Sequence, residues 1–245
     1  MSSDLQVVST PDQLAERCAV HIVQVALLAF ANRGVFRLCV AGGNTPRGAY
    51  ARLAQQDLAH QLDWQRVHIY FGDERCVPPD HPQSNYHMLH ESLLSRVPIP
   101  PSRVHRIAGE APPPLAAQSY SELLRSALGV EPDGSPRQTF DLVLLGLGAD
   151  GHTASLFPGS SLELEEWVSP RQHPTTGEWR VTLTEPLLNS AEETLFLVAG
   201  EDKAERLAEV RNTALDMLRL PAQRIVPRGH LRFLVDQAAA SRSFI

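Results

Sequence analysis

The chain is short of net positive charge, of cysteine and of long apolar runs, and each shortage excludes a class of protein. Its 245 residues carry 22 Lys and Arg against 28 Asp and Glu, which gives a formal net charge of −6. Binding to a nucleic-acid backbone needs clustered basic side chains, so this balance argues against a nucleic-acid partner. The three cysteines are odd in number and widely spaced, which indicates neither a disulfide framework nor a CxxC metal site.

The same shortages bear on location and domain organisation. We see no apolar run that approaches the roughly 20 residues of a membrane span, and the first residues lack the basic and apolar regions of a secretory signal. We therefore expect a cytoplasmic protein with no membrane partner. Apolar residues make up 43% of the chain and charged residues 20%, as in ordinary globular proteins. No long low-complexity linker divides the chain, so we expect residues 1–245 to form a single domain.

Lysine is almost absent. All but one of the 22 basic side chains are arginine, and the exception is Lys203. A compact ammonium group can hold a phosphate as a point charge, which makes Lys203 a candidate ligand. Chance survival in an arginine-biased chain is an equally good explanation of this one residue.

Short apolar, β-forming runs alternate with helical patterns along the chain. The predicted strands are 35–40, 67–71, 104–107, 140–145, 179–184, 194–198 and 231–235. The predicted helices are 11–33, 85–94, 115–128 and 203–210, with a further helix that starts at 46. Thr10 and Gln13 are expected to form a capping box, and Thr45 to cap the helix that Pro46 begins. This alternation predicts an α/β fold with a mostly parallel sheet and helices on both faces.

An acid and an imidazole follow the predicted strand 140–145 on a glycine-rich turn. The segment reads Gly-Leu-Gly-Ala-Asp-Gly-His, with Asp150 and His152 two residues apart. Open α/β sheets bind ligands at the carboxyl ends of their strands. A carboxylate beside an imidazole can fix the tautomer of the ring and raise its basicity, so we interpret Asp150 and His152 as a catalytic pair. The alternative is a turn aspartate next to an ordinary loop histidine.

The same turn formally matches the G-x-G-x-x-G pattern of dinucleotide-binding folds. That pattern needs a helix that opens at the glycines and an acidic residue at the end of a second strand. Pro158 interrupts the segment soon after the turn, and no suitable acidic residue follows in a strand-like context. We therefore disfavour a dinucleotide cofactor.

Further candidate ligands follow other strands. The turn Gly42, Gly43, Asn44 and Thr45 can present backbone N–H groups at a helix N-terminus, where an anion such as phosphate is favoured. A tight turn without a ligand remains the plain alternative. Asp73 and Arg75 follow the strand 67–71, and Arg180 lies on the strand 179–184; these charges either reach the same cleft or are simply solvated. The cluster of His81, His87, His90 and Glu91 matches no zinc spacing, so we expect no metal.

Taken together, several segments resemble the 6-phosphogluconolactonase family. The segments that carry the resemblance are Ala41–Pro46, 71–75 with Ser84-Asn85-Tyr86, 146–159, 180–184 with Leu188-Asn189, and 200–204. The resemblance covers nearly the whole chain, and the sole lysine falls on the family's lysine. It implies a Rossmann-like three-layer αβα fold related to the glucosamine-6-phosphate deaminases. It also implies hydrolysis of 6-phosphogluconolactone to 6-phosphogluconate, in the oxidative pentose phosphate pathway, without a metal or organic cofactor.

Two departures qualify the resemblance. The related deaminases carry a catalytic glutamate shortly after the histidine, whereas this chain has Leu-Phe-Pro-Gly from Leu156 onward, which favours the lactonase. Ala41 and Asn44 stand where relatives often have serine, which leaves the backbone turn intact.

The resulting hypothesis gives each candidate a role. His152 is expected to activate water as general base, and Asp150 to orient the ring. The substrate and its phosphate are expected to bind through Gly42, Gly43, Asn44, Thr45, Asp73, Arg75, Arg180 and Lys203. The expected partner is a small sugar-phosphate lactone, with no obligate protein partner. The rival hypotheses are a deaminase-isomerase, a non-catalytic sugar-phosphate sensor and a dinucleotide oxidoreductase.

Overall fold

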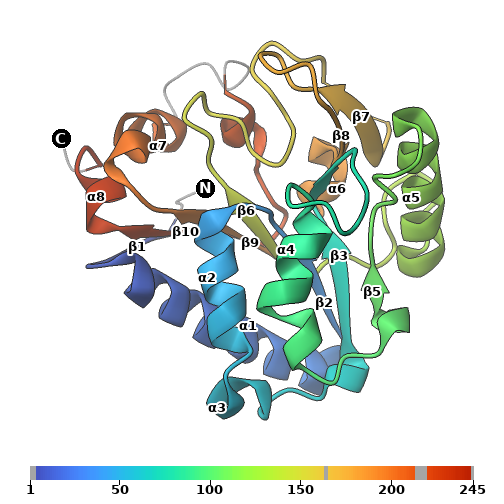
Figure 1. The fold of residues 1–245 in the computed structure, drawn as a ribbon, viewed down its shortest axis with the longest axis horizontal. Helices are drawn as coiled ribbons and strands as arrows, with labels where there is room; N and C mark the ends of the chain where they lie inside the picture. Colours follow the sequence, from blue (N-terminus) through green and yellow to red (C-terminus); the bar gives the residue numbers. More distant parts are fainter. Residues whose placement is uncertain (1–3, 163–164, 213–219, 244–245) are drawn as a thin grey trace.

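A computed structural model of the chain describes residues 4–162, 165–212 and 220–243 (Figure 1). The strands are β1 (Asp4–Val8), β2 (Phe36–Val40), β3 (Val67–Phe71), β4 (Asp73–Arg75), β5 (Val104–His105), β6 (Leu142–Gly146), β7 (Val168–Gln172), β8 (Trp179–Leu183), β9 (Glu193–Val198) and β10 (His230–Asp236). The α-helices are α1 (Pro11–Arg33), α2 (Asn44–Leu53), α3 (Gln56–Ala59), α4 (Asn85–Ser92), α5 (Pro113–Leu128), α6 (Glu185–Leu188), α7 (Ala204–Arg211) and α8 (Gln237–Ala240). Short 3-10 turns are 64–66, 94–96, 101–103, 201–203 and 221–224.

Seven strands form a parallel sheet in the order β1-β10-β9-β6-β2-β3-β5. Figure 1 shows α1, α2 and α4 on one face of this sheet, with α6, α7 and a smaller sheet on the other. The predicted α/β fold with helices on both faces is confirmed. The chain leaves β2 towards β3 but leaves β6 towards β9, on the other side. The strand order therefore reverses between β2 and β6, which is where such sheets bind ligands.

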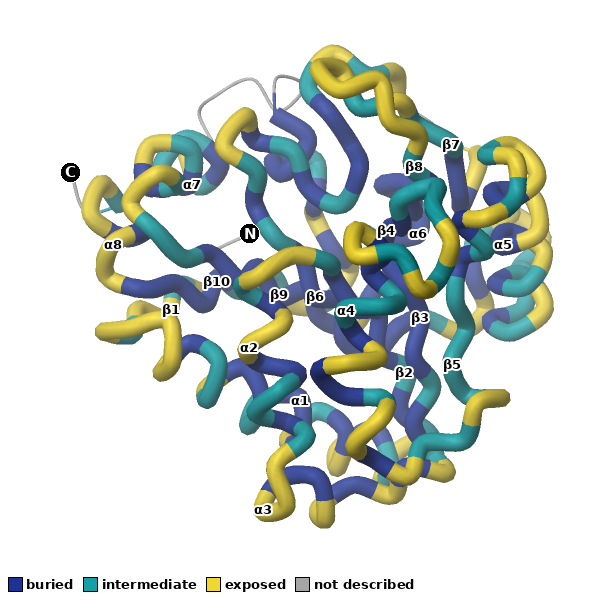
Figure 2. Tube along the Cα trace, viewed as in Figure 1, coloured by how far each residue is buried: buried dark blue, intermediate teal, exposed yellow. Residues whose placement is uncertain are grey.

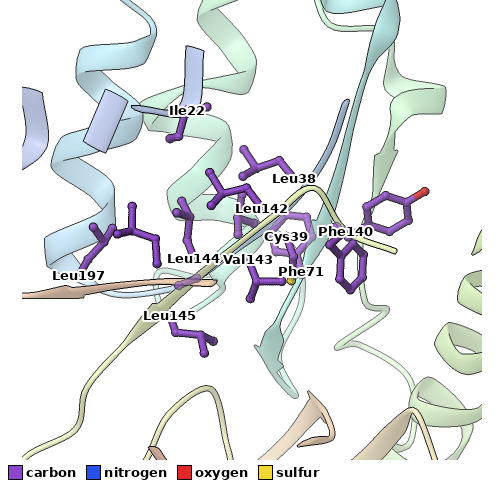
Figure 3. Close-up of a cluster of buried hydrophobic side chains, with 14 of the residues drawn as sticks. Ile22, Leu38, Cys39, Phe71, Phe140, Leu142, Val143, Leu144, Leu145 and Leu197 are labelled. Carbon is purple, nitrogen blue, oxygen red and sulfur yellow. The ribbon is translucent and has the colours of Figure 1, made fainter. Parts of the chain in front are cut away.

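The core surrounds the central strands of this sheet. Leu142, Val143 and Leu144 of β6 are fully buried, and Figure 3 shows Leu142 and Leu144 on the face of the strand towards Leu38 and Ile22, with Val143 on the other face. In Figure 2 the middle of the sheet is buried while the outer helices expose one side. Strands covered on both faces are continuous apolar runs, which is why the sequence located them. The single-domain prediction stays a prediction, and a cluster of buried apolar side chains that runs from Leu14 to Ala240 supports it.

Helix α1 begins and ends as predicted. The hydroxyl of Thr10 accepts a hydrogen bond from the N–H of Gln13, whose side chain accepts one from the N–H of Ser9. Gly34 ends the helix in the left-handed conformation, with φ of 79°. The expectation that no apolar run approaches the length of a membrane span is wrong: by length and apolar composition, α1 alone among the described helices could cross a membrane. Its apolar residues include seven that are buried, and the helix packs on β2 and β10, so a core helix explains the composition.

A second sheet was not anticipated. Strand β8 pairs antiparallel with both β4 and β7, outside the parallel sheet. From the sequence we expect Asp73 and Arg75 to follow a strand rather than to lie in one, and we predict no strand at β1 or β7. The reason is physical: β4 has three polar residues and β7 contains Pro170, so neither carries an apolar period.

Some boundaries differ as well. Gly43, with φ of 101°, is the N-cap of α2, and no side chain caps this helix, so the predicted Thr45 cap is wrong. Ser84 caps α4 by accepting from the N–H of His87, and the helix ends at Ser92 rather than at residue 94. The predicted strand 104–107 is two residues long, and Lys203 precedes α7 rather than beginning it.

Candidate active site

A cavity of about 380 Å³ opens where the strand order reverses, outside the carboxyl ends of β2 and β6. Nine of the ten predicted site residues line it: Gly42, Gly43, Asn44, Thr45, Asp73, Arg75, His152, Arg180 and Lys203. The tenth, Asp150, does not line the cavity but contacts His152. The structure therefore brings together residues that are spread over most of the chain.

Asp150 and His152 form a close pair. Nδ1 of the ring lies 2.6 Å from Oδ1 of Asp150, and the same oxygen accepts the backbone N–H of His152 at 3.1 Å. Partial burial works to raise the pKa of the Asp150 carboxyl, but these bonds and the charge of the ring outweigh it, so the pKa lies below its usual value. An ionised Asp150 at Nδ1 favours the tautomer that leaves Nε2 available to accept a proton.

Glycine at 148 makes room for this ring. A β-carbon at Gly148 would collide with Nδ1 and Cε1 of His152. The N–H of Gly148 donates to the carbonyl of His152 at 2.8 Å, which closes the turn. At Gly151 φ is 88°, in the left-handed region that favours glycine. Gly148 and Gly151 therefore allow the backbone and the His152 ring to take up these positions. Residues 147–160, which follow β6, form turns rather than the helix of a dinucleotide site.

The turn after β2 also lines the cavity. Helix α2 begins directly after Gly43, and because no side chain caps it, its first N–H groups remain available to a ligand. A β-carbon at Gly42 would collide with the side-chain amide of Asn85, so Asn85 lies directly on this turn. The use of this turn for anion binding stays a prediction. Asn85 is named in the sequence analysis only as part of a family motif.

Three cationic side chains face the same cavity. Arg75 and Arg180 are directly opposite each other across β4 and β8, and Lys203 reaches the cavity from the turn before α7. Like charges at directly opposed positions destabilise a sheet unless an anion balances them. The Nε atoms of Arg75 and Arg180 are buried without a hydrogen-bond partner among the described residues. Burial, and then the charge of Arg75, lower the pKa of Arg180, which still stays charged at neutral pH.

Asp73 is buried among these charges. Its Oδ1 accepts from Nδ2 of Asn85 at 3.2 Å, and its Oδ2 accepts from the hydroxyl of Ser155 at 2.7 Å. Its charge is attractive to Arg180. A carboxylate in this position would repel a phosphate group, so it suits a hydroxyl better than an anion.

Two further residues near the site, Glu74 and Phe157, are not among the predicted site residues. Glu74 is 2% exposed and accepts from the N–H groups of Arg75, Asn85 and Tyr86 and from the hydroxyl of Ser84. It joins β4 to the start of α4, and burial raises its pKa against the effect of these bonds.

The other missed residue is Phe157. Its ring centroid lies 5.3 Å from that of His152, and the guanidinium of Arg180 lies over it at 6.0 Å. The position of a single aromatic residue after a turn carries no signal that points to this contact.

The histidine cluster 81–91 lies apart from the cavity lining. His87 pairs with Glu91 one helical turn away, at 3.6 Å. Within the described ranges of the chain, no group of three or more His, Cys, Asp or Glu side chains is placed to hold a metal ion. The expectation of a metal-free site stays a prediction.

The chain is similar to known proteins over almost its whole length. The family model "Glucosamine-6-phosphate isomerases/6-phosphogluconolactonase" matches residues 9–234. A 6-phosphogluconolactonase of Synechocystis is 38% identical over 241 residues, covering 98% of each chain. A solved structure of the Trypanosoma brucei 6-phosphogluconolactonase superposes with a TM-score of 0.88 at 30% identity, covering 98% of each chain. A monomeric glucosamine-6-phosphate deaminase shares the fold, with a TM-score of 0.81 at 20% identity over 98% of this chain and 99% of its own.

Proposed function

The chain belongs to the family of glucosamine-6-phosphate isomerases and 6-phosphogluconolactonases, and on that premise we propose that it hydrolyses 6-phospho-D-glucono-1,5-lactone to 6-phospho-D-gluconate. This is the lactone-opening step of the oxidative pentose phosphate pathway. One observation carries the proposal: a single cavity is lined by the imidazole of His152, which Asp150 contacts from behind the lining, and by a glycine turn and three cationic side chains. A sugar-phosphate lactone carries an ester carbonyl, on which the imidazole can act, and a phosphate, which the turn and the cationic side chains can bind.

The phosphate is the part of the substrate that binds most strongly. Arg75, Arg180 and Lys203 supply positive charge, and the uncapped start of α2 at Gly43 supplies N–H donors. Arginines with unpartnered Nε atoms can form charge-assisted hydrogen bonds, which are roughly twice as strong as neutral ones. Binding energy from this remote group positions the lactone carbonyl for reaction.

The reaction itself falls to His152. Nε2 of the ring takes a proton from a water molecule, and the oxygen of that water attacks the lactone carbonyl carbon. The tetrahedral intermediate collapses, the bond to the ring oxygen breaks, and the imidazolium returns its proton to that oxygen. Asp150 holds Nδ1 and balances the charge of the imidazolium. Such acid–base catalysis typically contributes about 10²–10⁴-fold.

The remaining predicted ligands complete the arrangement. Gly42, Asn44 and Thr45 shape the turn that receives the phosphate, and Asp73 accepts a hydrogen bond from a sugar hydroxyl. Every one of these groups comes from this chain, so the proposal includes no obligate protein partner. It also includes no cofactor.

The deaminase alternative requires an additional acid near the histidine. The ring of Phe157 packs against His152 in the segment where the related deaminases are expected to carry a glutamate. An assay for ammonia release from glucosamine 6-phosphate separates the two activities.

The decisive test is proton release from freshly generated 6-phosphogluconolactone, corrected for spontaneous hydrolysis. The protein should accelerate release, and His152→Ala should lower kcat by at least about 100-fold while KM changes little. His87→Ala, at a partly exposed position outside the cavity lining, is the matched control and should behave like the wild type. If the folded wild-type protein gives no acceleration, the lactonase proposal is wrong; if His152→Ala is fully active, another group is the base.

A further inference from the structure

Ser155 is completely buried, does not line the cavity, and yet is bonded to a residue that does. Its hydroxyl donates to Oδ2 of Asp73 at 2.7 Å. Its backbone N–H donates to Oγ1 of Thr182 at 3.2 Å. Because Ser155 is three residues after His152, these two bonds attach the histidine loop to both β4 and β8.

The loop needs such an attachment. Ala154, between His152 and Ser155, has φ of 47°, the left-handed region, and is the sole described non-glycine residue with positive φ. This conformation is unfavourable for a residue with a β-carbon and persists only where the surroundings hold it. The residues on either side of Ala154 fix its conformation. The hydroxyl of Thr153 donates to the carbonyl of Gly146 at 2.8 Å, and Ser155 makes the two bonds described above.

The chain of hydrogen bonds continues from Asp73 to Asn85, which contacts the turn after β2. Nδ2 of Asn85 donates to the carbonyl and to Oδ1 of Asp73, at 2.9 and 3.2 Å, and the Asn85 amide lies on Gly42. Ser155, Asp73 and Asn85 are each at most 7% exposed. In a buried network, satisfied hydrogen bonds are stronger than in water and fix a single arrangement. The network therefore spans the distance between the histidine loop and the anion-binding turn.

We propose that Ser155 is a positioning residue of the lactonase, which sets the place of His152 relative to the bound phosphate through its bonds to Asp73 and Thr182. The inference rests on the proposed function, because it assumes that His152 activates the water that attacks a substrate anchored at the anion-binding turn. The distance between His152 and the bound phosphate must be fixed, because a displacement of about 1 Å at the reacting atoms can lower the rate about 100-fold.

The first test replaces the hydroxyl. Ser155→Ala should lower kcat by about 10-fold or more and leave KM within about twofold, because the phosphate ligands are untouched. Ser160→Ala is the matched control: its hydroxyl bonds only locally, to the carbonyl of Phe157, and kcat should stay unchanged. A purely structural serine would instead lower the thermal midpoint and leave kcat per folded molecule at the wild-type value, which would overturn the proposal.

A second pair of variants tests the other bond and does not depend on Ser155→Ala folding. Thr182→Val removes the acceptor with little change of shape and should lower kcat, whereas Thr182→Ser keeps the oxygen and should retain it. The double variant with Ser155→Ala should lose less than the product of the two single losses, because both bonds hold one turn. Equal activity of Thr182→Val and Thr182→Ser would contradict the inference. Wild-type lactonase activity, measured first, separates this failure from failure of the proposed function.

Discussion

The seven-stranded sheet is parallel and buries most of its strand residues, whereas the three-stranded sheet is antiparallel and carries charged side chains within its strands. The large sheet reaches the cavity only where its strands end, through the turns after β2, β6 and β9. The small sheet contributes Arg75 and Arg180 from the strands themselves. A strand covered on both faces has only its ends to offer a ligand, while an edge ribbon can present a whole face.

This comparison predicts that mutations in different regions of the molecule affect different properties of the enzyme. Changes in the turn after β6 should act on turnover, changes of the cationic side chains of the small sheet on substrate binding, and changes within the body of the large sheet on stability alone.

The largest effect is expected at Gly148. Its replacement by alanine places a β-carbon against the His152 ring, which must leave its position beside Asp150. Gly148→Ala should lower kcat by about 100-fold or more, as loss of a general base does. Gly146→Ala meets nothing within 4 Å and should cost far less. Steady-state lactone hydrolysis decides the matter, and a near-normal Gly148→Ala enzyme would show that the observed ring position is not the working one.

The small sheet offers a sharper contrast. Arg180→Met should raise KM about 10- to 100-fold, because a hydrogen bond to a charged group contributes about 1.5–3 kcal/mol. Arg171 lies opposite Arg180 on the next strand but does not line the cavity, and its guanidinium bonds to Ser161. Arg171→Met should leave KM near the wild-type value. Competition by inorganic phosphate should weaken in the first variant only, and equal behaviour of the two would remove Arg180 from the phosphate site.

Lys203 tests the contribution of the turn after β9. It is about a quarter exposed and pairs with Asp202 at 3.0 Å, so solvent and its partner screen the charge. Lys203→Met should therefore raise KM only about three- to tenfold, less than Arg180→Met. Lys203→Arg keeps the charge and should recover part of the loss. An unchanged KM in Lys203→Met would mean that the only lysine of the chain is not a phosphate ligand.

The smallest effect concerns the body of the large sheet. Burial, and then Arg103, His105 and Arg37, lower the pKa of His68 to about 4, and burial also lowers that of His105. The folded state then binds fewer protons than the unfolded chain between about pH 6.5 and 4, so the free energy of unfolding falls as pH falls through this window and is fully present above it.

Because His68 is half exposed, we expect its share of this loss to be about 1 kcal/mol. Urea unfolding at pH 7.5 and pH 5 should show the loss, and His68→Gln should reduce it, while His60→Gln, at an exposed position, should not. The kcat per folded molecule should be the same in all three proteins. A pH-dependent change of kcat specific to His68→Gln would contradict the prediction that changes within the large sheet affect stability alone.

The sequence predicted the large sheet better than the small one for a physical reason. Strands such as 36–40 and 193–198 are buried on both faces, so their apolar runs are visible without knowledge of any partner. Strand β4 consists of Asp73, Glu74 and Arg75, and it is a strand because β8, more than a hundred residues away, pairs with it. No local pattern reports that pairing.

The candidate site divides in the same way. The sequence by itself determined which chemical groups are present and which turns present them: the glycines around His152, the glycine turn at Gly42 and Gly43, and a single lysine. Backbone propensities and strand ends act over a few residues, so they are readable along the chain. Only the tertiary structure placed Arg75 opposite Arg180 and joined Ser155 to Asp73, because these contacts depend on strand pairing and burial between segments far apart in sequence.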